Sequence, residues 1–269
     1  MSASSQRVEV DGLSIAYERA GDGPPLVLLH GYLGDGRGTW HRQLDALSDE
    51  FTVVAWDAPG AGRSSDPPPS FSLADYADCL SGFVAALGLG RPHVAGVSFG
   101  GGLALEVYRR HPLLPKTLIL ASAYAGWAGS LPPEEVELRL RQVMEMADLP
   151  PDHLMGAVTR TLFSESAPST MVDEFADNAA QFHPSGLKAM ALSFAKADLR
   201  DILPHVDVPT LLLCGDSDVR APCSVAESIH AAIPGSRLVV LPGAGHVIPV
   251  EAAARFNAEV RAFVRLSEG

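Results

Sequence analysis

Short, continuously apolar segments recur along the chain, and longer amphipathic segments separate them. The apolar segments are rich in Leu and Val and span residues 8–10, 13–17, 25–29, 51–56, 93–97, 117–120, 210–213 and 237–241. Unbroken runs of this length are typical of strands buried on both faces, as in a parallel sheet. Asp11 and Gly12, between the first two runs, predict a tight hairpin turn. The sequence therefore predicts an α/β fold: a hairpin followed by strand–helix units, giving a mostly parallel eight-stranded sheet with helices on both faces.

One interval between predicted strands is much longer than the others. From Tyr124 to Leu203 no strand is predicted, and four amphipathic stretches follow one another at residues 133–146, 152–163, 169–182 and 186–197. Ligands of open α/β sheets bind beyond the carboxyl ends of the strands, so we interpret this interval as a helical lid inserted after strand 6. The alternative is a plain extension of the core. The predicted division is a core domain of residues 1–124 and 204–269 and a lid of residues 125–203.

Composition narrows the possible partners and the location. The 269 residues are 47% hydrophobic, enough for a large core, and carry a formal net charge of -12. That charge argues against nucleic acid or an anionic membrane as a main partner, because both need clustered Lys and Arg. No apolar run is long enough to span a bilayer, and residues 1–7 lack the apolar core of a signal peptide. The prediction is a cytoplasmic protein, with no indication of its oligomeric state.

The three cysteines and the histidines suggest no structural zinc site. The chain has a small and odd number of cysteines, Cys79, Cys214 and Cys223, which does not suit a disulfide framework. The CxxC and HExxH spacings of zinc sites are absent. Cys214 directly follows the apolar run at residues 210–213, which predicts a buried free thiol. No metal or organic cofactor is expected.

A possible nucleophile follows the fifth apolar run. Residues 96–100 fit the G-x-S-x-G pattern around Ser98, with a helix-forming stretch after it. In such a turn the Ser backbone is strained, and side chains two residues before and after it would collide, so both positions favour Gly. The pattern alone is common by chance; the preceding strand and following helix give it weight. The loop at residues 30–34, after the third run, could aim the backbone N–H of Tyr32 at a developing oxyanion, with a second N–H from Phe99.

Two further loops, each after a predicted strand, supply a possible acid and base. Asp216 and Asp218 both follow the seventh run, and either could hold the tautomer of a general-base histidine. His246 stands on a Gly-rich loop after the last run, from which it could reach a nucleophile at the sheet edge. The chain order of serine, aspartate and histidine is that of α/β-hydrolases, and differs from the chymotrypsin and subtilisin orders.

Taken together, these motifs resemble the α/β-hydrolase superfamily, in its lid-bearing branch, over nearly the whole chain. Residues 57–64 resemble the family's D-x-x-G-x-G-x-S loop, and residues 243–263 resemble its C-terminal block. The family acid usually ends a G-x-x-D motif, so the resemblance favours Asp218 and leaves Asp216 as the fallback. It implies a catalytic triad of Ser98, Asp218 and His246.

The resemblance implies acyl transfer to water, with a small or medium carboxylic ester or lactone as the substrate. Superfamily members with an Asp nucleophile are excluded by Ser98. Two alternatives stay open: a triad-bearing small-molecule receptor, and a carbon–carbon bond hydrolase or lyase of the same superfamily. Within the lid, Trp127 is the residue that we expect to contact the substrate, because it lies near the lid's entry.

Overall fold

A computed structural model describes residues 4–149, 161–179 and 183–268 of the chain. Eight strands form a single sheet in the order β1-β2-β4-β3-β5-β6-β7-β8. The first two strands pair antiparallel, as do β2 and β4, and all later pairs are parallel. The strands are β1 (Ser4–Val10), β2 (Leu13–Ala20), β3 (Pro25–Leu29), β4 (Thr52–Trp56), β5 (His93–Val97), β6 (Thr117–Ala121), β7 (Thr210–Gly215) and β8 (Arg237–Leu241). The predicted fold class is confirmed.

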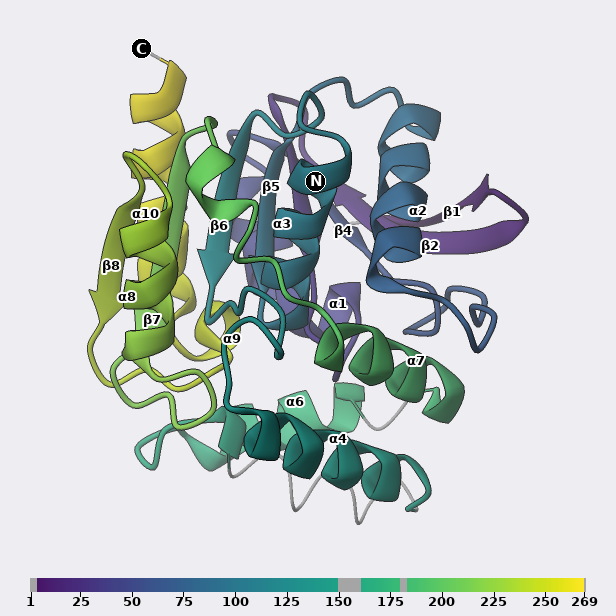
Figure 1. Cartoon of the computed structure of the whole chain (residues 1–269). Helices are drawn as coiled ribbons and strands as arrows, with labels where there is room; N and C mark the ends of the chain where they lie inside the picture. Colours follow the sequence, from purple (N-terminus) through teal and green to yellow (C-terminus); the bar gives the residue numbers. More distant parts are fainter. Residues whose placement is uncertain (1–3, 150–160, 180–182, 269) are drawn as a thin grey trace.

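Helices cover both faces of this sheet (Figure 1). On one face α1 (Gly36–Leu47) and α10 (Ala253–Glu268) pack against the sheet through side chains such as Trp40 and Phe256. The other face is covered by α2 (Leu73–Ala86), α3 (Phe99–Arg110) and α8 (Cys223–Ala232). A short helix, α9 (Ile248–Glu251), precedes α10.

In its described residues, the long interval between β6 and β7 contains helices joined by loops and no strand. It contains α4 (Pro133–Ala147), α6 (Ser169–Ala179), α7 (Pro184–Ala195) and the 3-10 turn η1 (Leu203–His205). Figure 1 shows α4, α6 and α7 beyond the edge of the sheet where the parallel strands end. The helix predicted at residues 152–163 falls largely outside the described residues.

The predicted hairpin is present, and its turn explains the choice of residues. Asp11 and Gly12 connect β1 to β2 with φ values of 47° and 81°. Both values are positive, as a two-residue turn between twisted strands requires, and Asp and Gly tolerate them well.

The last strand departs from the prediction of burial on both faces. Every residue of β4, β5, β6 and β7 is buried, but Val240 of β8 is 43% exposed. The difference arises because β8 is the edge strand, with a neighbour on one side only. An apolar run alone does not reveal its position in the sheet.

Cys214 is buried as predicted, but the prediction that it is a free thiol was wrong. Cys214, at the end of β7, forms a disulfide with Cys223, the first residue of α8, and their Cα atoms are 5.5 Å apart. The connecting loop turns back on itself and brings the two ends together, which counting cysteines could not reveal. Cys79 is free and buried. Since disulfides are rare in reducing compartments, the predicted cytoplasmic location would leave this pair as two thiols.

A thiol count tests the pairing directly. Burial, and to a lesser extent the charge of Asp11, raises the pKa of the Cys79 thiol to about 12, so the native protein should show no fast-reacting thiol at neutral pH. After unfolding without a reductant we expect one thiol per chain by Ellman titration, and after reduction three, the number of cysteines in the sequence. Three thiols in the unfolded, unreduced protein would contradict the disulfide.

Candidate active site

Ser98 occupies a sharp turn between β5 and α3. Its backbone φ is 55°, in the left-handed region that non-glycine residues rarely adopt. A Cβ at Gly96 would lie 2.2 Å from the carbonyl carbon and oxygen of Gly100, and a Cβ at Gly100 would lie 2.2 Å from the carbonyl oxygen of Leu29. The two glycines of the motif are therefore required by close backbone contact, as the sequence predicted.

Replacing Gly100 with alanine should destabilise the fold. The added methyl group meets backbone atoms that cannot move aside, so we expect the free energy of unfolding to fall by about 3 kcal/mol in urea titrations. Gly88→Ala is the matched control. Gly88 has a φ of +62° but open space around its Cα. Alanine there should therefore lower the free energy of unfolding only through its left-handed backbone conformation, by about 1 kcal/mol. Equal losses in the two variants would show that steric contact at the turn is unimportant.

The Ser98 side chain lies at the N-terminus of α3 but does not cap the helix. Ser98 stands at the N-cap position of α3, yet its hydroxyl makes no capping hydrogen bond. The backbone is fixed by bonds from Ser98 N–H to the Ala121 carbonyl (2.9 Å) and from Gly101 N–H to the Ser98 carbonyl (3.0 Å). The hydroxyl lines a pocket together with His246.

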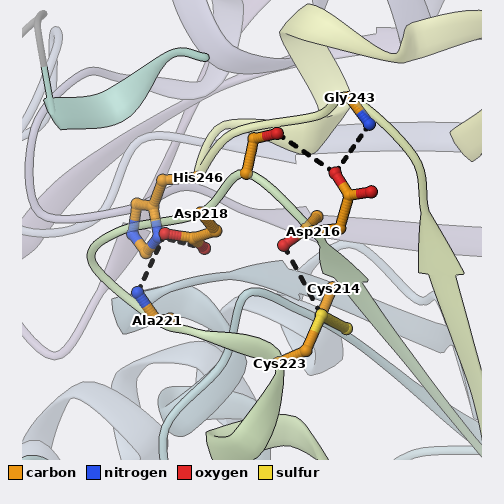
Figure 2. The surroundings of a disulfide bond; sticks show 9 residues. Cys214, Asp216, Asp218, Ala221, Cys223, Gly243 and His246 are labelled. Atoms are coloured by element: carbon orange, nitrogen blue, oxygen red, sulfur yellow. Dashed lines mark hydrogen bonds and ion pairs between the residues drawn. A yellow bond between two sulfur atoms is a disulfide. The ribbon is translucent and has the colours of Figure 1, made fainter. Parts of the chain in front are cut away.

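His246 and Asp218 form a buried pair (Figure 2). His246 Nδ1 lies 2.8 Å from Asp218 Oδ2, while Asp218 Oδ1 accepts hydrogen bonds from the backbone N–H groups of Arg220 and Ala221, both at 2.8 Å. Burial by itself raises the pKa of Asp218, but the charge of His246, its hydrogen bond and the two N–H groups together outweigh burial and lower the pKa below its ordinary value. Asp218 is thus an anion at neutral pH, bonded to one specific nitrogen of the imidazole.

Asp216, the fallback acid, has a different set of partners. Its Oδ1 accepts hydrogen bonds from the backbone N–H of Gly243 (2.7 Å) and from the Ser217 hydroxyl (3.1 Å). Figure 2 shows this carboxylate joining the loop after β7 to the loop that carries His246. The geometry therefore gives Asp218 to the imidazole and makes Asp216 a tie between the two loops.

The histidine loop is also tied to the helical segment between β6 and β7. The backbone N–H of His246 donates to the Leu162 carbonyl (2.8 Å). Glu251 accepts from the Gly245 N–H (2.8 Å) and from the backbone N–H and hydroxyl of Ser164. Sequence reasoning missed the contacts with Leu162 and Ser164, because they join positions more than 80 residues apart.

The loop after β3 lies against Ser98, where the predicted oxyanion donors are needed. A Cβ on Gly31 would be 3.7 Å from Ser98 Cβ, so the backbone entering Tyr32 runs beside the serine. His30 holds this loop: its Nε2 accepts from the Ala58 N–H (3.0 Å), which leaves Nδ1 to donate to the Gly31 carbonyl (2.6 Å). Phe99 opens α3, and N–H groups of a first helical turn have no acceptor within the helix. Both predicted donors thus border Ser98.

The pocket beside Ser98 and His246 is mostly apolar. Its empty space amounts to about 360 Å³ when the open solvent at its mouth is included. Its lining consists of Gly31, Tyr32, Leu33, Thr39, Val97, Ser98, Leu162, Phe175, Arg220, His246 and Val247. Leu162 and Phe175 come from the segment between β6 and β7. Of the polar residues, sequence reasoning missed Thr39 and Arg220.

Trp127 lies behind this lining. It is 1% exposed, and its ring packs edge-on against Tyr32 with centroids 5.9 Å apart. Within the described residues, the side chains that line the pocket do not include Trp127. A substrate contact by Trp127 stays a prediction, and its observed contact is with a residue that forms the wall.

Comparisons with known proteins agree with the fold and identify the family. Residues 24–253 match the family model of the alpha/beta hydrolase fold, and the chain belongs to that family. A thermophilic esterase from Thermogutta terrifontis superposes with a TM-score of 0.89 at 29% identity, over the full length of both chains. An esterase from Exiguobacterium antarcticum gives a TM-score of 0.85 at 26% identity, covering 95% of this chain and 97% of that one.

A sequence relative carries a different name. The putative carbamate hydrolase RutD of Cronobacter turicensis is 29% identical over 87% of this chain and 89% of its own length.

In the part of the chain that the structure describes, no helix is both long and apolar enough to cross a membrane. Nor do His, Cys, Asp and Glu side chains gather in threes there in a way that could hold a metal ion.

Proposed function

We propose that the protein is a serine hydrolase that cleaves a small or medium carboxylic ester or lactone. The observation that carries the proposal is that Ser98 and His246 line the same pocket. Ser98 stands on a strained turn, and the imidazole of His246 has its Nδ1 fixed by the buried anion Asp218. Nucleophile, base and orienting acid are the parts that acyl transfer through an enzyme ester requires.

Each residue has a distinct role in the proposed reaction. His246 Nε2, the ring nitrogen that Asp218 does not engage, takes the proton of the Ser98 hydroxyl while the oxygen attacks the carbonyl carbon. The N–H groups of Tyr32 and Phe99 stabilise the oxyanion of the tetrahedral intermediate. The intermediate then expels the alcohol, which takes its proton from His246, and an acyl group remains on Ser98. Water, deprotonated by His246, then attacks the acyl carbon. The bond to Ser98 Oγ breaks, this oxygen takes the proton back from His246, and the acid is released.

The segment at residues 125–203 serves as a lid in this proposal. It supplies Leu162 and Phe175 to the pocket wall and contacts the His246 loop through the Leu162 carbonyl. The rest of the chain, residues 1–124 and 204–269, forms the core domain that carries the triad. A segment that both shapes the pocket and contacts the histidine loop is suited to select the substrate.

A pre-steady-state experiment tests the reaction class. Wild-type protein mixed with p-nitrophenyl butyrate should release a burst of about one p-nitrophenol per chain, followed by slower turnover. The esterase names of two solved neighbours support the ester, and the carbamate hydrolase name of RutD makes an aryl carbamate the natural competitor. No turnover of esters, lactones or carbamates, with retained binding of a ligand, would favour the receptor alternative.

A further inference from the structure

One cation lines the pocket that holds Ser98. Arg220 stands on the loop between β7 and α8, two residues after Asp218, and its side chain borders the pocket. Its guanidinium donates to the Tyr32 hydroxyl (Nη2, 2.6 Å) and to the Thr161 hydroxyl (Nη1, 3.0 Å). Both partners are neutral, so these hydrogen bonds place the charge without neutralising it.

The carboxylates near Arg220 have other partners. Asp218 accepts from the Arg220 backbone N–H, but its side chain is taken up by His246 and by a second backbone N–H. In the described parts of the chain, residues 4–149, 161–179 and 183–268, no carboxylate forms an ion pair with the Arg220 guanidinium. Arg220 is partly buried, and most of the pocket wall beside it is apolar.

The position of Arg220 is fixed from behind. Its carbonyl accepts hydrogen bonds from Arg139 Nη2 (2.9 Å) and from the Tyr124 hydroxyl. Arg139 belongs to α4 and also bonds to Glu135, so its own charge is paired. Arg220 is held at its backbone and at two of its five guanidinium N–H groups, so its side chain is preorganised. The other three N–H groups have no hydrogen-bond acceptor among the described residues.

A second polar group in the same pocket is unsatisfied. Thr39 is 3% exposed and lines the pocket, yet its hydroxyl has no hydrogen-bond partner among the described residues. Buried hydroxyls are nearly always bonded, so a group of this kind in a pocket indicates polar atoms on the ligand. Thr39 and Arg220 therefore point independently to a polar ligand, and the donors of Arg220 require hydrogen-bond acceptors on it.

We propose that the substrate carries a carboxylate in addition to the bond that is cleaved, and that Arg220 binds it. The inference rests on the proposed function, because it names the substrate class of the same site. A carboxylate supplies the missing negative charge and matches the planar fork of N–H donors that arginine presents. Arg220 is a specificity-determining residue in this account, while Ser98 and His246 perform the reaction.

Matched pairs of alkyl esters test the proposal in a pH-stat. Monomethyl succinate against methyl butyrate places the charge on the acyl side, and acetoxyacetate against propyl acetate places it on the alcohol side. For wild-type protein we expect kcat/KM to favour the charged ester in one pair. Arg220→Gln should lower the ratio of charged to neutral kcat/KM by about tenfold or more, and Arg220→Lys, which keeps the charge but loses the fork, by less.

The control variant separates local from long-range charge. Arg237→Gln removes one cation from the edge strand, where Arg237 pairs with Glu259, and should leave the ratio unchanged. A ratio that Arg220→Gln leaves unchanged in both pairs, or that Arg237→Gln lowers equally, overturns the proposal. Failure of the proposed function itself appears differently, because hydrolysis would then persist in Ser98→Ala.

Discussion

Replacing Ser98 with alanine should lower kcat/KM for p-nitrophenyl butyrate by about five to six orders of magnitude. The variant keeps the pocket and the buried pair of His246 and Asp218, but it has no hydroxyl to form the acyl enzyme. The acyl-enzyme burst should vanish with the turnover. Rates are measured by stopped-flow for the burst and by steady-state absorbance for the residual activity.

Ser228→Ala is a suitable control for this result. Ser228 is an exposed residue of α8 whose hydroxyl donates to the Ser224 carbonyl of its own helix, so its removal should leave kcat/KM unchanged. Matching thermal unfolding of Ser98→Ala and the wild type would show that the loss is chemical. Activity within tenfold of the wild type in Ser98→Ala would rule out Ser98 as the nucleophile.

Replacing Asp218 with asparagine should lower kcat/KM by about four orders of magnitude. Asparagine has a similar shape, but its amide carries no charge to stabilise the imidazolium that forms when His246 takes the serine proton. Its NH₂ group can also donate to Nδ1, which would place the ring proton on Nε2 and block the base. The loss should appear in kcat, because Asp218 bonds to His246 and lies behind the imidazole.

Asp216→Asn is the control that separates the orientation of His246 by a carboxylate from the joining of the two loops by Asp216. The asparagine carbonyl can still accept from the Gly243 N–H, so kcat should stay within about tenfold of the wild type. A large loss in Asp216→Asn and a small one in Asp218→Asn would reverse the assignment of the acid. Similar large losses in both would show that loop position, and no single carboxylate, controls the histidine.

Features governed by short-range rules were predictable from the sequence. The glycines flanking Ser98 follow from close backbone contact, and the Asp11-Gly12 turn follows from its positive φ values. The apolar runs gave the strands of the sheet, because burial on both faces leaves a continuous pattern. Positions after strand ends pointed to His246 and to Asp216 or Asp218, and the family resemblance favoured Asp218. The structure pairs Asp218 with His246.

Features that depend on how distant segments meet were not predictable. Helix α1 is an example, because its first turn contains Gly36 and Gly38, which are poor helix formers. Packing of Trp40 against the sheet compensates for their low helix propensity. The loop between β7 and α8 folds back on itself. This fold brings Cys214 next to Cys223 and places Arg220 at the pocket. Glu251 bonds to Ser164 and to Gly245, which belong to loops that are distant in the sequence and become neighbours only in the folded chain.

A fluorophosphonate probe tests the central claim most directly. Such reagents phosphonylate a serine only where a base activates it, and peptide mass spectrometry locates the adduct. The account predicts one adduct per chain, on Ser98, and much slower labelling of Asp218→Asn. An adduct on another serine, or no adduct on protein that turns over p-nitrophenyl butyrate, would contradict it.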